Sequence, residues 1–219
     1  NHTYTAGICI IYNGSNGSTY ADELIINNCV NNGEIEGDTV AGIIGNSSGN
    51  LKLSDCENNG AINGRYSAGG IAQCIENKNS SEAEVSNCIN NGNVFGGEEA
   101  AGIIDYAEGI TVTNCINNGN ISSNGYVGGI FSYTSSVKGT GLVNNGKISG
   151  LEDIGGISAY DEGNSIFSKL YNTGVIDEEN IGAQVSNLVK LGESSTGEEL
   201  EEEHKHDYVA LSTVTKATT

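Results

Sequence analysis

Apolar and polar positions recur along this chain in a fixed order, about every 27 residues. The clearest marker is the phrase Asn-Cys-Ile-Asn-Asn-Gly, which occurs at Asn87–Gly92 and again at Asn114–Gly119. Close variants of it are found at Asn28–Gly33, Asp55–Gly60, Gly141–Gly146 and Lys169–Gly174. The closing glycines are therefore 27, 32, 27, 27 and 28 residues apart. Such a period is typical of solenoids, whose units bury a core only by stacking on one another.

Three short apolar stretches, separated by Gly, Asn and Ser, make up each period. One follows a Gly-Ile phrase, and one surrounds the cysteine position, where Gly139 interrupts an otherwise apolar column. The third lies two residues after each closing glycine and is always β-branched: Ile35, Ile62, Val94, Ile121, Ile148 and Ile176. This pattern predicts an all-β, parallel β-solenoid (β-helix) of about seven rungs with three short strands per rung. Only Ile181–Leu191 has an apolar spacing that permits a short capping helix.

Asparagine pairs precede almost every closing glycine, as at Asn90-Asn91 and Asn117-Asn118. Stacked in register, their amides can hydrogen-bond along the rod as a ladder. Asparagine also tolerates the left-handed backbone of a turn, and we expect the closing glycine to supply a positive φ there. These residues are predicted to hold a turn rather than to bind a ligand.

The six cysteines invite a disulfide or metal hypothesis, but their spacing favours another role. Four of them share one column with two leucines: Cys29, Cys56, Cys88, Cys115, Leu142 and Leu170. A residue type that alternates with leucine is most simply a small buried hydrophobe. No CxxC pair or paired histidine ligands accompany them, so we expect no metal site and no cofactor.

Two rungs are longer than the others, and the extra residues lie in the same corner, within Tyr12–Asp22 and Cys74–Glu84. Insertions in solenoids tend to collect on one face, which often binds a partner, although a solvated loop explains them equally well. Tyrosines add a further column with a spacing of 27 residues. Candidate binding residues are therefore Tyr12, Tyr20, Tyr106, Tyr133 and Tyr160. Packing of the aligned rings on one another is the alternative, because Ile11 and Cys74 share their column.

Composition and charge limit the partners. The chain has 219 residues, a formal net charge of -19 and nine basic residues, of which Arg65 is the single arginine. This balance argues against nucleic acid and anionic membrane surfaces as partners. No apolar run is long enough to span a membrane, so we expect no membrane insertion.

The repeat predicts a solenoid domain over residues 1–190. A linker rich in Ser, Gly and Glu follows at 191–203, and residues 204–219 are interpreted as the start of a further β-module or a disordered tail. His204 and His206 stand beside acidic residues there, but they lack a third fixed metal ligand. The stretch from His206 to Thr219, with Lys-Ala-Thr at Lys216–Thr218, resembles the opening of small β-modules in surface proteins of Gram-positive bacteria. This resemblance suggests that the chain was cut from a longer multi-module protein.

Gly42-Ile43-Ile44-Gly45, followed by the Asp-Cys-x-Asn-x-Gly phrase at Asp55–Gly60, is similar to GLUG-motif repeats. The resemblance covers about residues 6–183, and among the rungs only Gly42–Gly45 shows both glycines of the motif. It implies a secreted or cell-surface bacterial protein, such as an adhesin-like chain or the non-catalytic region of an IgA-cleaving metallopeptidase. The family supplies no catalytic residues to carry over.

These observations predict a non-enzymatic, extracellular rod or stalk that binds host glycans or extracellular proteins. The alternatives are an accessory repeat domain of a secreted peptidase and a carbohydrate-active β-helix enzyme. Carboxylates available for acid–base work are Glu98, Glu99, Asp105, Glu108, Asp161 and Glu162. Calcium-dependent stabilisation is a further hypothesis, although no Gly-Gly-x-Gly-x-Asp array is present.

Overall fold

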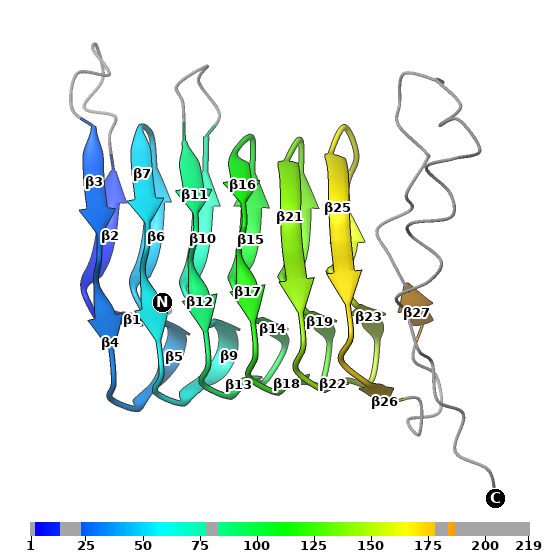
Figure 1. Ribbon diagram of the computed structural model, residues 1–219. Helices are drawn as coiled ribbons and strands as arrows, with labels where there is room; N and C mark the ends of the chain where they lie inside the picture. The colour runs from blue at the N-terminus through cyan, green and yellow to red at the C-terminus, as the bar shows by residue number, and fades with distance from the viewer. Residues whose placement is uncertain (1–2, 14–22, 78–82, 178–183, 187–219) are drawn as a thin grey trace, which may run out of the picture.

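The computed structural model describes residues 3–13, 23–77, 83–177 and 184–186, and it shows a rod of stacked coils (Figure 1). All strand pairs in these ranges are parallel, they form three sheets, and no helix occurs. One of these sheets, called sheet B below, contains six strands, one from each successive coil. The predicted parallel β-solenoid is therefore confirmed, with six coils in the described ranges where the sequence predicted about seven rungs.

Each coil passes through the three sheets in the order A, B, C. Sheet A comprises β1 (Tyr4–Ala6), β5 (Ile35–Ala41), β9 (Ile62–Gly69), β13 (Val94–Gly96), β14 (Glu99–Ala101), β18 (Ile121–Ser123), β19 (Tyr126–Gly128), β22 (Ile148–Ser149), β23 (Asp153–Gly155), β26 (Ile176–Asp177) and β27 (Gln184–Ser186). Sheet B comprises β2 (Cys9–Asn13), β6 (Ile44–Ser48), β10 (Ala72–Glu76), β15 (Ile104–Glu108), β20 (Phe131–Ser135) and β24 (Ser158–Asp161). Sheet C comprises β3 (Leu24–Asn27), β4 (Val30–Asn31), β7 (Leu51–Ser54), β8 (Glu57–Asn58), β11 (Glu84–Ser86), β12 (Ile89–Asn90), β16 (Thr111–Thr113), β17 (Ile116–Asn117), β21 (Lys138–Asn144) and β25 (Ile166–Asn172).

The C-terminal part of the chain differs from the sequence prediction where it is described. The proposed helix over Ile181–Leu191 is wrong at Gln184–Ser186, because these residues form β27 and pair with β23 in sheet A. An edge strand offers them backbone hydrogen bonds in register, which a single helical turn would forgo. The linker at 191–203 and the segment 204–219, with His204 and His206, lie outside the described residues.

Sheet A gives the rod a second core. In each coil the chain crosses sheet A twice, first in an outer arm such as β13 and then in an inner arm such as β14. Val94 from the outer arm and Ala100 from the inner arm are buried in one cluster, which continues along the rod. The main core lies between sheets B and C, and the isoleucines of the Gly-Ile corners from Ile43 onward belong to it. We infer that two narrow cores run side by side along the rod.

The register agrees with the predicted columns. The β-branched column is paired from coil to coil, for example Val94 with Ile121 and Ile121 with Ile148. The exception at Gly139 is explained by its neighbour, because a Cβ built there would lie 2.5 Å from Cδ1 of Phe167. The larger ring of the next coil thus fills the space that an ordinary side chain would take.

Two ladders of asparagines run along sheet C, as predicted. Inner asparagines such as Asn90 and Asn117 are fully buried, and each donates from Nδ2 to Oδ1 of the next coil at 2.7–2.8 Å. Each also donates to the carbonyl oxygen of its own closing glycine. Outer asparagines such as Asn91 and Asn118 are exposed and donate in the opposite direction, toward the preceding coil.

The role assigned to the closing glycines was wrong. Their φ angles do not lie in the left-handed region, which is occupied instead by the residue before the cysteine position: Asn28, Asp55, Asn87, Asn114, Gly141 and Lys169. Every closing glycine after Gly33 allows close approach of the preceding coil. A Cβ at Gly119 would lie 1.9 Å from the carbonyl oxygen of Gly92 in the preceding coil, far inside van der Waals contact.

Candidate functional site

The candidate tyrosines of sheet B form a stack. Tyr106, Tyr133 and Tyr160 are paired in register on β15, β20 and β24. The rings of Tyr106 and Tyr133 lie 4.7 Å apart between centroids and only 7° from parallel, whereas those of Tyr133 and Tyr160 lie 5.3 Å apart and are tilted by 31°. Because the ring faces are turned toward one another, Tyr133 has both faces covered. This arrangement favours packing over face-on stacking against sugars for the inner rings.

Of the other two candidate tyrosines, only the backbone of Tyr12 is described. The backbone of Tyr12 pairs with Ser47, one position along from the tyrosine column, in which Ile11 pairs with Asn46. Tyr20 lies outside the described residues. Tyr160, at 42% exposure, is the most accessible ring of the stack.

Carboxylates hold the phenol ends of the stack. The hydroxyl of Tyr106 donates to Oε2 of Glu108 at 3.1 Å, and Glu162 lies near the hydroxyl of Tyr133. Burial and the negative charge of Glu108 raise the pKa of Tyr106 well above its usual range. Burial and the nearby Glu162 raise the pKa of Tyr133 to about 12. The phenols therefore remain protonated donors at physiological pH, and these two glutamates are engaged by them.

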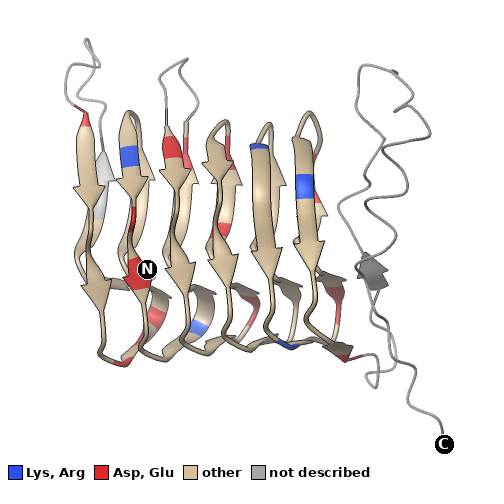
Figure 2. Cartoon of the chain, viewed as in Figure 1, with Lys and Arg blue, Asp and Glu red and all other residues tan. Residues whose placement is uncertain are grey.

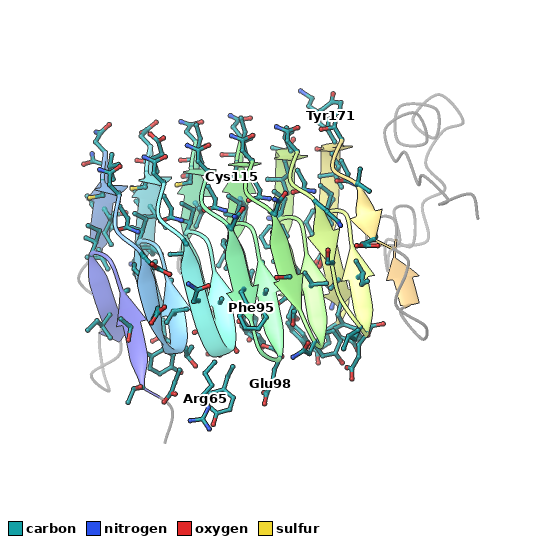
Figure 3. The ribbon with its side chains drawn as sticks, turned by 90° about the horizontal axis from the view of Figure 1, so that it is seen from below. Arg65, Phe95, Glu98, Cys115 and Tyr171 are labelled. Atoms are coloured by element: carbon teal, nitrogen blue, oxygen red, sulfur yellow. The ribbon has the colours of Figure 1, made fainter. Side chains whose placement is uncertain are left out.

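Tyr126, on sheet A, adds a fourth aromatic ring beside the tyrosine stack of sheet B. It lies on β19 in sheet A, and its ring is 6.0 Å from that of Tyr160 and tilted by 56° to it. Beside it is a shallow hollow of about 320 Å³, lined by Gly97, Glu98, Glu99, Asn124, Gly125, Tyr126 and Glu152. Glu98 lies at the outer edge of sheet A (Figure 3). The sequence analysis missed Tyr126, because its column reads Ser67, Glu99, Tyr126 and Asp153 and has no tyrosine period.

Asp105 is fully buried where sheets A and B meet. The hydroxyl of Ser132 donates to its Oδ1, and Nε2 of Gln73 donates to its Oδ2 at 3.2 Å. Burial, followed by the charge of nearby Glu99, raises the pKa of Asp105 to about 8. Burial and the charge of Glu98 raise the pKa of Glu99 as well. Asp105 thus has the perturbed titration expected of an acid catalyst, but no surface through which it can reach a polymeric substrate.

The remaining carboxylates proposed for catalysis do not converge on one accessible point. Asp161 accepts hydrogen bonds from Thr134 at 3.0 Å and from Ser165 at 2.6 Å. Glu108 and Glu162 lie at the hydroxyls of Tyr106 and Tyr133. Glu98 is exposed in the hollow beside Tyr126. In Figure 2 the acidic residues are spread along the rod rather than gathered on one coil.

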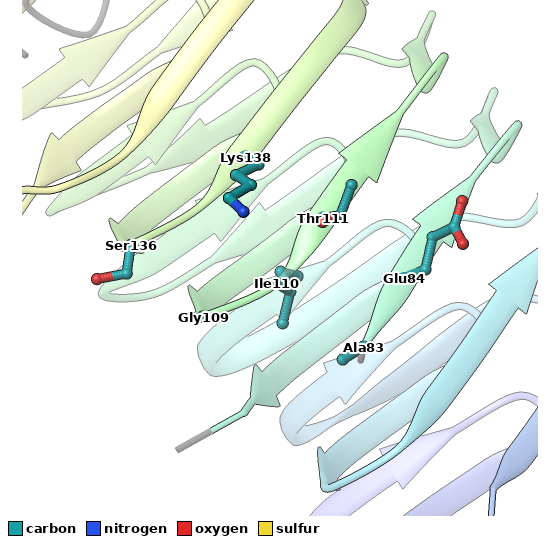
Figure 4. Close-up of a pocket in the computed structure, with 7 residues that line it drawn as sticks. All are labelled: Ala83, Glu84, Gly109, Ile110, Thr111, Ser136 and Lys138. Carbon is teal, nitrogen blue, oxygen red and sulfur yellow. The ribbon is translucent and has the colours of Figure 1, made fainter. Parts of the chain in front are cut away.

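A second hollow, of about 360 Å³, lies on sheet C at the corner of the insertions (Figure 4). It is lined by Ala83, Glu84, Gly109, Ile110, Thr111, Ser136 and Lys138. Glu84, Thr111 and Lys138 occupy one column on three successive strands, so a carboxylate and an ammonium flank a hydroxyl. Residues 78–82 are outside the described residues, whereas Cys74 and Glu76 belong to β10, so the insertion is narrower than the sequence suggested.

All six cysteines lie in the described residues, and none forms a disulfide. The predicted burial of their column is confirmed, since Cys56, Cys88 and Cys115 are at most 1% exposed and Cys29 is half-buried. Within the described ranges no group of three or more His, Cys, Asp or Glu side chains is placed to enclose a metal ion. These ranges also contain no helix that could cross a bilayer.

Comparison with known proteins adds no relative: no family model, no curated protein and no solved structure matches this chain.

Proposed function

We propose that this chain is a non-enzymatic repeat module of a bacterial cell-surface or secreted protein, in which it acts as a rod or stalk. The observation that carries the proposal is the continuous register of the coils. Each buried asparagine amide is hydrogen-bonded to the asparagine of the next coil along the rod. A rod of this kind acts as a spacer that holds the domains attached to its two ends apart. Its acidic surface keeps it in solution and away from anionic membranes.

Binding of a host glycan or extracellular protein is assigned to the two hollows. The hollow at Glu84 and Lys138 combines opposite charges with a hydroxyl, a set of groups that recognises polar, largely neutral ligands. The hollow beside Tyr126 adds an aromatic edge to three glutamates. Because both are shallow and solvent-exposed, we expect weak binding that depends on many copies of the rod.

An array of glycans and extracellular-matrix proteins tests this proposal. We expect the chain to bind at least one component, and the substitutions Glu84→Gln and Lys138→Gln together to weaken binding at least tenfold. Lys52→Gln is the matched control, because Lys52 is adjacent to Glu84 in the same column but lies outside the hollow. Tyr126→Ala examines the other hollow, and Tyr160→Ala examines the exposed ring beside it.

Failure to bind any component, or equal binding by all these variants, contradicts the adhesive role. An enzymatic role is examined in the same preparations by incubating the chain with pectin, alginate and glycosaminoglycans. New reducing ends or unsaturated products that form with the chain, but not with a heat-denatured sample of it, would contradict the proposal and indicate a carbohydrate-active enzyme.

A further inference from the structure

Four thiols are stacked in one file inside the rod. Cys29, Cys56, Cys88 and Cys115 occupy equivalent positions in successive coils. The N–H of the residue after a cysteine donates to the carbonyl oxygen of the cysteine in the preceding coil, at 2.9–3.0 Å: Glu57 to Cys29, Ile89 to Cys56 and Ile116 to Cys88. This register places the four side chains one above another, and the thiols of Cys56, Cys88 and Cys115 each donate to the carbonyl oxygen two residues earlier, at 3.1–3.4 Å. Cys115 lies inside the rod in Figure 3.

The spacing of this file matches a particular coordination geometry. Neighbouring strands in a parallel sheet lie about 4.8 Å apart, and so do equivalent side chains of successive coils. A metal–sulfur bond measures about 2.3 Å, so an ion bound in a line between two sulfurs holds them about 4.6 Å apart. Monovalent Cu(I) and Ag(I) accept two thiolates in a line, and soft thiolate ligands select such ions.

We propose that the file from Cys29 to Cys115 is a binding site for soft monovalent metal ions, each bound in a line between the sulfurs of two successive coils. A thiolate sulfur does not bridge two ions at a straight angle, so each thiol joins one pair and the full file takes up to two ions.

Charge balance supports this stoichiometry. Each ion that binds displaces one thiol proton to water, so two ions release two protons and each pair of sulfurs keeps one S–H group. The loaded file then carries no net charge, which suits a buried site. A bare thiolate is disfavoured in this buried file, because it would lack a counter-charge. The displaced proton must therefore be replaced by a cation in the same place.

Access is from one end of the file. Cys29 is half-buried, whereas Cys56, Cys88 and Cys115 are at most 1% exposed. Beyond Cys115 the column continues as Leu142, which is fully buried and offers no ligand. Ions therefore enter between Cys29 and Cys56 and move inward from sulfur to sulfur.

The remaining two cysteines provide an internal control. Cys9 pairs in register with Ile44, and Cys74 with Asn46 and Tyr106, so neither has a thiol as its neighbour in register. Zinc is a second control, because it requires four ligands in a tetrahedron and the file presents sulfurs in a line.

The test is Cu(I) loading of the fully reduced chain under anaerobic conditions, with a chromophoric Cu(I) chelator as competitor. Metal content after gel filtration and protons released are both measured. We expect up to two Cu(I) ions in the unaltered chain and in the double variant Cys9→Ala/Cys74→Ala. Cys88→Leu should retain one ion, between Cys29 and Cys56, whereas Cys56→Leu should retain none because the remaining pair has no exposed thiol. Leucine is the natural occupant of this column at positions 142 and 170, so both variants are expected to fold.

Equal copper content in Cys56→Leu and the unaltered chain overturns the proposal, as does loss of copper in the Cys9→Ala/Cys74→Ala variant or retention of zinc by the file. If a leucine variant fails to fold, X-ray absorption of the copper-loaded unaltered chain decides. Two sulfur ligands per copper support the proposal, and three or more ligands, or oxygen and nitrogen ligands, contradict it.

Discussion

The side-chain amide of Asn90 donates to Oδ1 of Asn117 at 2.7 Å, and both side chains are completely buried. The second amide hydrogen of Asn90 is donated to the carbonyl oxygen of Gly92 at 2.8 Å. Since both amide hydrogens are used, the orientation of the amide is fixed. In every coil the inner asparagine therefore donates to the asparagine of the next coil. The inner ladder therefore specifies register: a slip would leave several buried amides without partners.

Replacing Asn117 by leucine should destabilise the rod by about 3 kcal/mol or more, because it removes partners from Asn90, Asn144 and the carbonyl oxygen of Gly119 while they stay buried. Urea unfolding followed by circular dichroism measures the change. Asn118→Ala is the matched control. It removes outer-ladder bonds of similar length from an exposed residue, where water substitutes, and should cost less than about 1 kcal/mol. Equal losses would show that burial of the ladder is irrelevant.

Gly119→Ala should be severely destabilising, whereas the equivalent change Gly33→Ala should be tolerated. The new Cβ at position 119 would lie 1.9 Å from the carbonyl oxygen of Gly92, but at position 33 the nearest atom is Oδ1 of Asn31 at 3.7 Å. Both glycines close the same sequence phrase and neither has a positive φ, so the pair isolates the effect of close approach. Thermal unfolding of the two variants should differ by more than 10 °C, and similar midpoints would contradict the explanation.

Asp105 should make the rod less stable as the pH rises from about 4 to about 8. Its pKa is raised to about 8 in the fold, so between its ordinary pKa and that value the folded chain binds a proton that the unfolded chain has lost. The stabilisation is complete below pH 4, declines by up to about 1.4 kcal/mol per pH unit and is absent above pH 8. Glu99, whose pKa is also raised, contributes in the same direction.

Asp105→Asn should flatten this dependence, because the amide is neutral at every pH. Unfolding free energies at pH 5, 7 and 9 measure the slope, and Asp55→Asn, at an exposed carboxylate, is the control. An unchanged slope in Asp105→Asn would show that Asp105 is ionised in the folded rod.

Gly139 and Phe167 should be energetically coupled. Gly139→Ala alone brings a Cβ to 2.5 Å from Phe167 and 2.9 Å from Leu142, so it should destabilise the rod by overpacking. Phe167→Leu alone leaves a cavity beside Phe131, whose ring lies 6.1 Å away. In the double variant the smaller side chain makes room for the new methyl group, so the losses should sum to about 1–2 kcal/mol less than expected for independent sites. Strict additivity in a double-mutant cycle would contradict this coupling.

Much of the fold could be predicted because residues one repeat apart in the sequence are neighbours in successive coils. Cys88 and Cys115, or Ile121 and Ile148, stand one period apart and are therefore stacked. The candidate site was less accessible to prediction. The sequence aligned Tyr106 with Tyr133 but did not reveal that their rings face each other, and it gave no reason to associate Tyr126 with Tyr160.

By itself, the sequence determined the parallel solenoid, the columns of isoleucine, cysteine and asparagine, and the corner that holds the insertions. The physical reason is that a side chain repeated at a constant interval meets its own copy when the coils stack. Only the tertiary structure decided which residues meet across a coil, because that depends on the angle of each turn and on the double passage through sheet A. It therefore decided the burial of Asp105 beside Glu99, the position of positive φ at Asn87 and Asn114, and the close contact that excludes any side chain at Gly119.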